Sequence, residues 1–152
     1  MSTMSKTDAN ISENKNNILI TLLASICSLG PLATDMYLPA LPQMTLDFAT
    51  TPSIIQLTLT SWLIGLAIGQ VIAGPLSDIY GRTRPLVFGL IIFTISSVAC
   101  ILAPSIELFI FARFIGGFAA SSALVVSRAI ASDIYKGTML TKFLATVMII
   151  QG

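Results

Sequence analysis

Residues 53–75 read SIIQLTLTSWLIGLAIGQVIAGP, a stretch without a single charged side chain. In a helix that rises 1.5 Å per residue, about 23 residues reach roughly 34 Å, enough to cross the ~30 Å hydrocarbon layer of a bilayer. A helix is the expected form, because it satisfies its backbone hydrogen bonds internally, whereas an open strand would expose unpaired groups to lipid. This stretch is therefore predicted to form a transmembrane helix.

Comparable apolar segments lie on both sides of it. They cover residues 18–41, 85–103, 105–131 and 140–152, the last of them incomplete. Residues 1–17 are polar and have almost nothing to bury, so they are predicted to form a disordered cytoplasmic tail. We therefore predict an all-α, polytopic transmembrane helix bundle, with a membrane domain over residues 18–152.

The composition supports this fold class and excludes several functions. Hydrophobic residues make up 55% of the chain and charged residues only 10%, against about 25% in soluble domains. The net charge of +1 gives no reason to expect a nucleic-acid partner. There is no histidine, and Cys27 and Cys100 lie too far apart for a recognisable disulfide framework or metal site. No phosphate-binding loop motif occurs, so we expect neither ATP nor another cofactor, and no enzyme.

The positions of the basic residues predict the orientation. With the exception of Arg113, they all precede the first span or lie at the connections after the second and fourth spans. They are Lys6, Lys15, Arg82, Arg84, Arg128, Lys136 and Lys142. The positive-inside rule places these segments in the cytoplasm, together with the amino terminus.

Two charged residues fall inside predicted spans. Asp35 lies about 9 Å and Arg113 about 12 Å from the outer ends of the first and fourth spans, at 1.5 Å per residue. Charges at such depth pair with one another, face a cavity or mark a transport pathway. One interpretation is a buried ion pair that pins the two helices together. We favour the other, in which Asp35 exchanges protons while Arg113 keeps a cavity electropositive.

Polar and small residues of the second and fourth spans are candidates for lining such a cavity. They are Gln56, Trp62, Gln70, Gly116 and Gly117. Helix packing is the simpler role for each, since small residues allow helices to approach closely in lipid. The same applies to the G-x-x-x-G pattern of Gly65 and Gly69.

The connection between the second and third spans carries a recognisable motif. Residues 74–86 read GPLSDIYGRTRPL, and Gly74 with Pro75 is predicted to make a tight reversal. The stretch resembles the loop signature G-x-L-A-D-R-x-G-R-K-x-x-L of the major facilitator superfamily. Its fixed positions are occupied by Gly74, Leu76, Asp78, Gly81, Arg82 and Leu86. Ile79 and Thr83 replace basic residues, which implies a thinner charge network.

Further stretches narrow the resemblance. Residues 32–42, LATDMYLPALP, are similar to the first-helix signature of drug:proton antiporters. Residues 113–117, RFIGG, are similar to their fourth-helix motif R-x-x-Q-G, with Gly116 in place of Gln. Residues 56–78 and 127–135 resemble Bcr/CflA-type multidrug efflux transporters of bacterial inner membranes.

The resemblance implies the first part of a six-helix half and proton-coupled export of small drugs. Asp35 and Arg113 would be the proton- and substrate-linked pair. The expected partners are a small-molecule substrate, protons, the lipid bilayer and missing carboxy-terminal helices, because the fifth span stops at Gly152. Three alternatives stay open: an importer of a small metabolite, a non-transporting membrane subunit and an inactive truncated fragment.

Overall fold

The computed structural model describes the backbone of residues 6–151 and the side chains of residues 17–150. This part of the chain consists of helices and their connections, without a strand. The elements are α1 (Lys6–Asp35), the short 3-10 helix η1 (Leu38–Ala40), α2 (Leu41–Asp47), α3 (Pro52–Tyr80), α4 (Thr83–Ile101), α5 (Ile106–Ile134) and α6 (Thr138–Gln151). The predicted all-α fold is confirmed.

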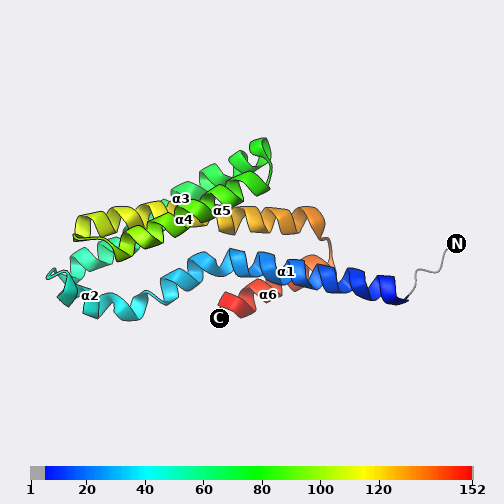
Figure 1. Cartoon of the computed structure of the whole chain (residues 1–152), viewed down its shortest axis with the longest axis horizontal. Helices are drawn as coiled ribbons and strands as arrows, with labels where there is room; N and C mark the ends of the chain where they lie inside the picture. The colour runs from blue at the N-terminus through cyan, green and yellow to red at the C-terminus, as the bar shows by residue number, and fades with distance from the viewer. Residues whose placement is uncertain (1–5, 152) are drawn as a thin grey trace.

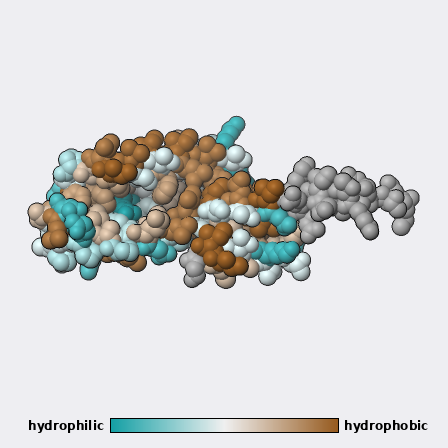
Figure 2. All heavy atoms as spheres, turned by 60° about the horizontal axis from the view of Figure 1, so that its bottom comes forward, coloured by the Kyte–Doolittle hydropathy of each residue, from teal (hydrophilic) through white to brown (hydrophobic). Residues whose placement is uncertain are grey.

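Four helical segments are long and apolar enough to cross a membrane. They cover Asn17–Asp47, Pro52–Tyr80, Thr83–Ile101 and Ile106–Ile134, and a shorter apolar helix follows at Thr138–Ile150. Figure 2 shows apolar side chains over much of the middle of one face, with hydrophilic ones more frequent toward its ends. Both observations fit a bundle that lies across a bilayer.

Helix α5 is the centre of the bundle. It packs most extensively against α3, then against α4 and α1, while α6 packs mainly against α1 (Figure 1). Cys27 of α1, Phe143 of α6 and Ala131 of α5 are fully buried in the cluster that joins these three helices. Helix α5 thus contacts helices that precede it in the sequence and, less extensively, the one that follows it.

The contact between α3 and α5 depends on glycine. A Cβ atom at Gly65 would fall on the Phe114 backbone, and one at Gly117 would collide with the carbonyl oxygen of Trp62. This close approach lets the Ser61 hydroxyl donate a hydrogen bond of 2.9 Å to the Ile110 carbonyl oxygen of α5. Small residues are used here as expected for helix association in lipid.

The structure corrects two expectations about helix boundaries. Helix α1 begins at Lys6, so residues 6–17 are helical where a disordered tail was predicted; residues 1–5 of that tail lie outside the described residues. Extending an existing helix by one residue avoids the cost of nucleation, which lets a polar segment continue a stable apolar helix. Helix α3 likewise continues through Gly74 and Pro75, and the chain reverses at Gly81, whose φ of +82° suits glycine.

Candidate functional site

Arg113 lies near the start of α5 among aromatic rings. Its Cζ atom is 3.7 Å from the ring centroid of Tyr37, 5.5 Å from that of Phe109 and 5.7 Å from that of Trp62. A guanidinium within about 6 Å of an aromatic face is attracted by the ring quadrupole, more strongly where water is excluded. Three π-systems therefore stabilise this charge inside an apolar span.

Tyr37 connects three elements around that charge. It lies two residues after the end of α1, is buried, and stacks on Phe109 with ring centroids 6.3 Å apart. Its hydroxyl forms a short hydrogen bond with Thr58 Oγ1 of α3, and Thr58 in turn donates to the Ile55 carbonyl oxygen at 2.5 Å. The turn after α1 is thereby held against α3 by a hydrogen bond and against α5 by ring stacking.

A cavity of about 420 Å³ opens beside Arg113. Its lining combines aromatic, small and sulfur-containing side chains from α1, α2, α3, α4, α5 and the turn after α1: Ala33, Tyr37, Met44, Trp62, Phe93, Ser96, Ser97, Cys100, Ile101, Phe109, Arg113 and Gly116. Two N–H groups of the lining residues, Trp62 Nε1 and Arg113 Nε, are buried without a hydrogen-bond partner in the described part of the chain. Buried donors are nearly always paired, so these two need an explanation.

The structure brings together only some of the predicted site residues. Trp62 and Gly116 line the cavity with Arg113. Gly117 packs against the Trp62 backbone, whereas Gln56 and Gln70 are exposed and lie outside the cavity lining.

Asp35 does not pair with Arg113, so the interpretation as a buried ion pair is wrong. The Asp35 side chain is exposed, and none of the ion pairs among the described side chains involves either residue. Ala33 and Tyr37 face the cavity. Asp35 is midway between them, and two residues turn a helix by roughly 200°. This agrees with an Asp35 carboxylate that is exposed and lies outside the cavity lining.

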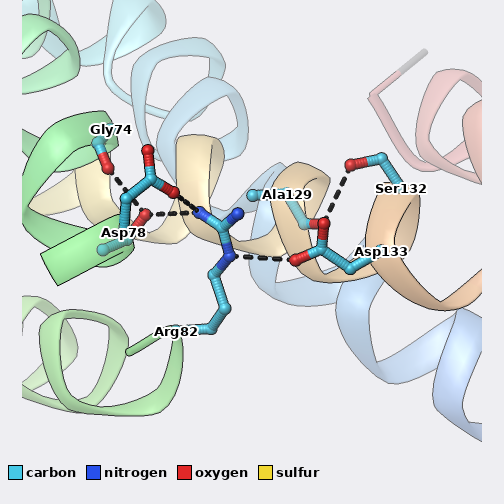
Figure 3. Close-up of polar contacts among 7 residues, drawn as sticks. Gly74, Asp78, Arg82, Ala129, Ser132 and Asp133 are labelled. Atoms are coloured by element: carbon cyan, nitrogen blue, oxygen red, sulfur yellow. Dashed lines mark hydrogen bonds and ion pairs between the residues drawn. The ribbon is translucent and has the colours of Figure 1, made fainter. Parts of the chain in front are cut away.

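A second polar cluster lies at the other end of the bundle, where α3, α4 and α5 meet. Figure 3 shows Arg82 between Asp78 and Asp133. One terminal nitrogen of Arg82 is 2.6 Å from Asp78 Oδ1 and donates to Ser77 Oγ at 2.8 Å, and its Nε donates to Asp133 Oδ2 at 3.0 Å. The pKa of Arg82 is raised, first by the hydrogen bond to Asp133 and further by the charges of both carboxylates, against some desolvation.

The other fixed positions of the loop motif are glycine and leucine, whose side chains take no part in this polar cluster. Gly81 makes the reversal, and Leu86 is buried beside Ala123 and Val126 of α5. Leu76 is exposed, and a side chain at Gly74 would meet open space.

Asp133 is a member of this cluster that the sequence reasoning missed. A signal was present, because Ser77-Asp78-Ile79-Tyr80 recurs as Ser132-Asp133-Ile134-Tyr135. The two copies end α3 and α5, which are both 29 residues long and pack together. The aspartates of two equivalent helix ends thus meet at one arginine.

Arg82→Gln is expected to loosen the carboxyl end of α5, because Asp133 loses its ion pair with Arg82. Trypsin should then cleave after Lys136, an exposed residue of the α5–α6 connection, several-fold faster in the solubilised protein. Arg84→Gln is the matched control, since Arg84 is exposed and takes no part in the ion pairs of the described side chains. Equal cleavage rates for both variants would contradict a fastening role for Arg82.

Comparison with known proteins places this architecture in a family. Residues 22–152 match the model of the Major Facilitator Superfamily. The chain is 46% identical over 132 residues to the uncharacterized MFS-type transporter YdgK of Bacillus subtilis, covering 87% of the chain and 33% of that protein. It is 41% identical over 118 residues to a chloramphenicol resistance protein of Pseudomonas aeruginosa, covering 78% of the chain and 28% of that protein.

A bicyclomycin resistance protein homolog of Haemophilus influenzae is 31% identical over 133 residues, which is 88% of the chain and 33% of that protein. The chain thus spans about a third of the length of these relatives. The superfamily comprises membrane transporters and not enzymes. Together with the apolar helices and the loop motif around Arg82, the match shows that this multi-pass membrane chain belongs to the major facilitator superfamily, as the motifs predicted.

Proposed function

We propose that this chain is the amino-terminal part of a transporter that exports small drugs in exchange for protons. The observation that carries the proposal is Arg113, a cation inside an apolar span that borders a cavity and forms no ion pair with any of the described carboxylates. Such a charge is costly in a membrane and is retained mainly for transport, pairing or substrate contact. The names of two relatives, a chloramphenicol resistance protein and a bicyclomycin resistance protein homolog, favour drugs as substrates.

Asp35 is the proposed proton carrier. Its exposed carboxylate is not held by Arg113, so a proton can bind to it without breaking an ion pair. As the transporter alternates between two conformations, the access of water to this group changes, and with it the balance between the charged and the neutral form. Proton release on one side of the membrane would thereby be linked to drug movement.

The proposed location is the bacterial inner membrane, with the amino terminus in the cytoplasm. Arg82, Arg84, Arg128, Lys136 and Lys142 lie at or near the α3–α4 and α5–α6 connections, and the positive-inside rule assigns these to the cytoplasm. The Arg113 cavity then belongs to the outer half of the bilayer. Import of a metabolite is the second candidate, which differs in the direction of flux.

Everted membrane vesicles test the proposal. We expect vesicles that contain the transporter, extended to the full length of its relatives, to accumulate chloramphenicol when their interior is acidified, because the outward proton flux drives drug inward. Collapsing the pH gradient with nigericin should reduce accumulation to the level of vesicles without the transporter. Accumulation that persists after nigericin, or drug movement only in the same direction as the protons, would contradict antiport.

A further inference from the structure

Two side chains that line the Arg113 cavity each carry an N–H group without a hydrogen-bond partner among the described residues. Trp62 is only 3% exposed, yet no described group accepts a hydrogen bond from its Nε1–H, and the same holds for the Arg113 Nε–H. An indole N–H and a guanidinium can donate but cannot accept, and the guanidinium keeps its charge in proteins. What is missing from this site is therefore a hydrogen-bond acceptor.

The remaining lining does not supply that acceptor. The Ser96 hydroxyl donates to the Ala112 carbonyl oxygen at 2.5 Å, and the Ser97 hydroxyl donates to the Phe93 carbonyl oxygen at 2.9 Å. Neither hydroxyl oxygen accepts a hydrogen bond from the Trp62 Nε1–H or the Arg113 Nε–H group. Among the residues that the structure describes, the lining contains no Asp or Glu side chain, and Arg113 is its sole charged member. A second cation would be repelled here, whereas an anion or a strong dipole would be attracted.

The walls suit a flat apolar body. Trp62 and Phe93 meet edge to face with ring centroids 6.2 Å apart, and the Tyr37 and Phe109 rings lie against Arg113. Aromatic rings prefer edge-to-face or offset contacts with a further ring. The volume of about 420 Å³ lies within the range of roughly 300–1,000 Å³ that small-molecule pockets occupy.

We propose that this cavity binds a planar aromatic compound that carries a carboxylate or a comparable acceptor group. When the compound binds, the Trp62 and Arg113 side chains turn so that Nε1 and Nε donate to the acceptor, and Phe93 contacts the ring. That such a compound is also the transported substrate rests on the proposed function, while its binding does not. The cavity would thus favour aromatic compounds that carry an acceptor group over aromatic cations.

Cys100 provides a direct reporter, because its free thiol lines the cavity and is partly exposed. The chain of residues 1–152 is placed in lipid nanodiscs as a Cys27→Ala variant, so that Cys100 is the single thiol. Alkylation by N-ethylmaleimide is then followed with benzoate or benzylamine present. Benzoate should slow the reaction in a saturable manner and shift the emission of Trp62, the single tryptophan. Benzylamine, a cation of the same size, should do neither.

Two cavity variants test the donors. Arg113→Gln and Trp62→Phe should each weaken the protection by benzoate by about tenfold, since a hydrogen bond to a charged group contributes enough to account for that factor. Thr60→Val is the matched control, because Thr60 is exposed on α3, two residues from Trp62, and donates to the Gln56 carbonyl oxygen of its own helix. Its protection by benzoate should be unchanged.

Three results would overturn the proposal. They are equal protection by benzoate and benzylamine, unchanged protection in both cavity variants, and a Cys100 thiol that does not react even without a ligand because lipid or protein covers the cavity. None of these measurements involves transport. If benzoate binds as expected but no proton-linked drug flux occurs, the binding site stands and the proposed antiport fails.

Discussion

Replacing Asp35 by Asn is expected to abolish proton-coupled efflux by the full-length transporter, while the protein still inserts into the membrane in normal amounts. An amide has the shape of the carboxyl group but cannot bind and release a proton in the physiological range. In the described part of the chain, the Asp35 side chain is exposed and takes no part in an ion pair, so the variant leaves no buried partner behind. The variant should therefore lose little folding stability, while its drug efflux is no longer coupled to protons.

Asp47→Asn is the matched control for this experiment. Asp47 is the exposed last residue of α2, at the same end of the bundle, and its Oδ1 accepts a 2.9 Å hydrogen bond from Gln43, which Asn can still accept. Efflux driven by a pH gradient should persist in Asp47→Asn and disappear in Asp35→Asn, measured at equal protein amounts in everted vesicles. Efflux retained by Asp35→Asn would exclude Asp35 as the proton carrier. If these helices served only for packing, Asp35→Asn would instead change the stability of the protein and nothing else.

Adding one methyl group at Gly117 is expected to cause the largest loss of stability of any single change considered for this bundle. In Gly117→Ala, the new Cβ would meet the Trp62 carbonyl oxygen, a backbone atom of α3 that cannot rotate away. Overpacking of this kind costs about 1–3 kcal/mol, and more where backbone must shift. The two helices would have to separate along their main contact, which would also displace Trp62 from the Arg113 cavity.

Gly74→Ala adds the same methyl group to the interior of α3, where nothing lies within 4 Å of the new atom. Alanine is favoured over glycine within a helix by roughly 1 kcal/mol, so this variant should be neutral or slightly stabilised. Thermal unfolding of the detergent-solubilised protein, followed by circular dichroism, should move in opposite directions for the two variants. Similar melting temperatures for the two variants would show that α3 and α5 lie farther apart at Gly117 than in the structure.

Much of the fold could be predicted because membrane insertion depends on the apolar character of continuous segments. The run from Ser53 to Pro75 lies within α3, and the apolar segments expected on both sides of it are also helical. Boundaries were harder to predict, since α1 extends over residues 6–17 and α3 continues past Pro75 to Tyr80. Helix propagation and the position of a turn depend on neighbouring residues and on tertiary contacts that composition does not contain.

The sequence by itself determined the helical membrane fold, the family and the two charges inside the spans, Asp35 and Arg113. Each of these follows from residue type and from spacing along one segment. Only the tertiary structure decided that Arg113 is surrounded by Tyr37, Trp62 and Phe109 and not paired with Asp35, and that Arg82 joins Asp78 to Asp133. The physical reason is rotation, because each residue turns a helix by about 100°. The partners of a side chain therefore depend on which faces meet, and this is set by close contacts such as that of Gly117 with Trp62.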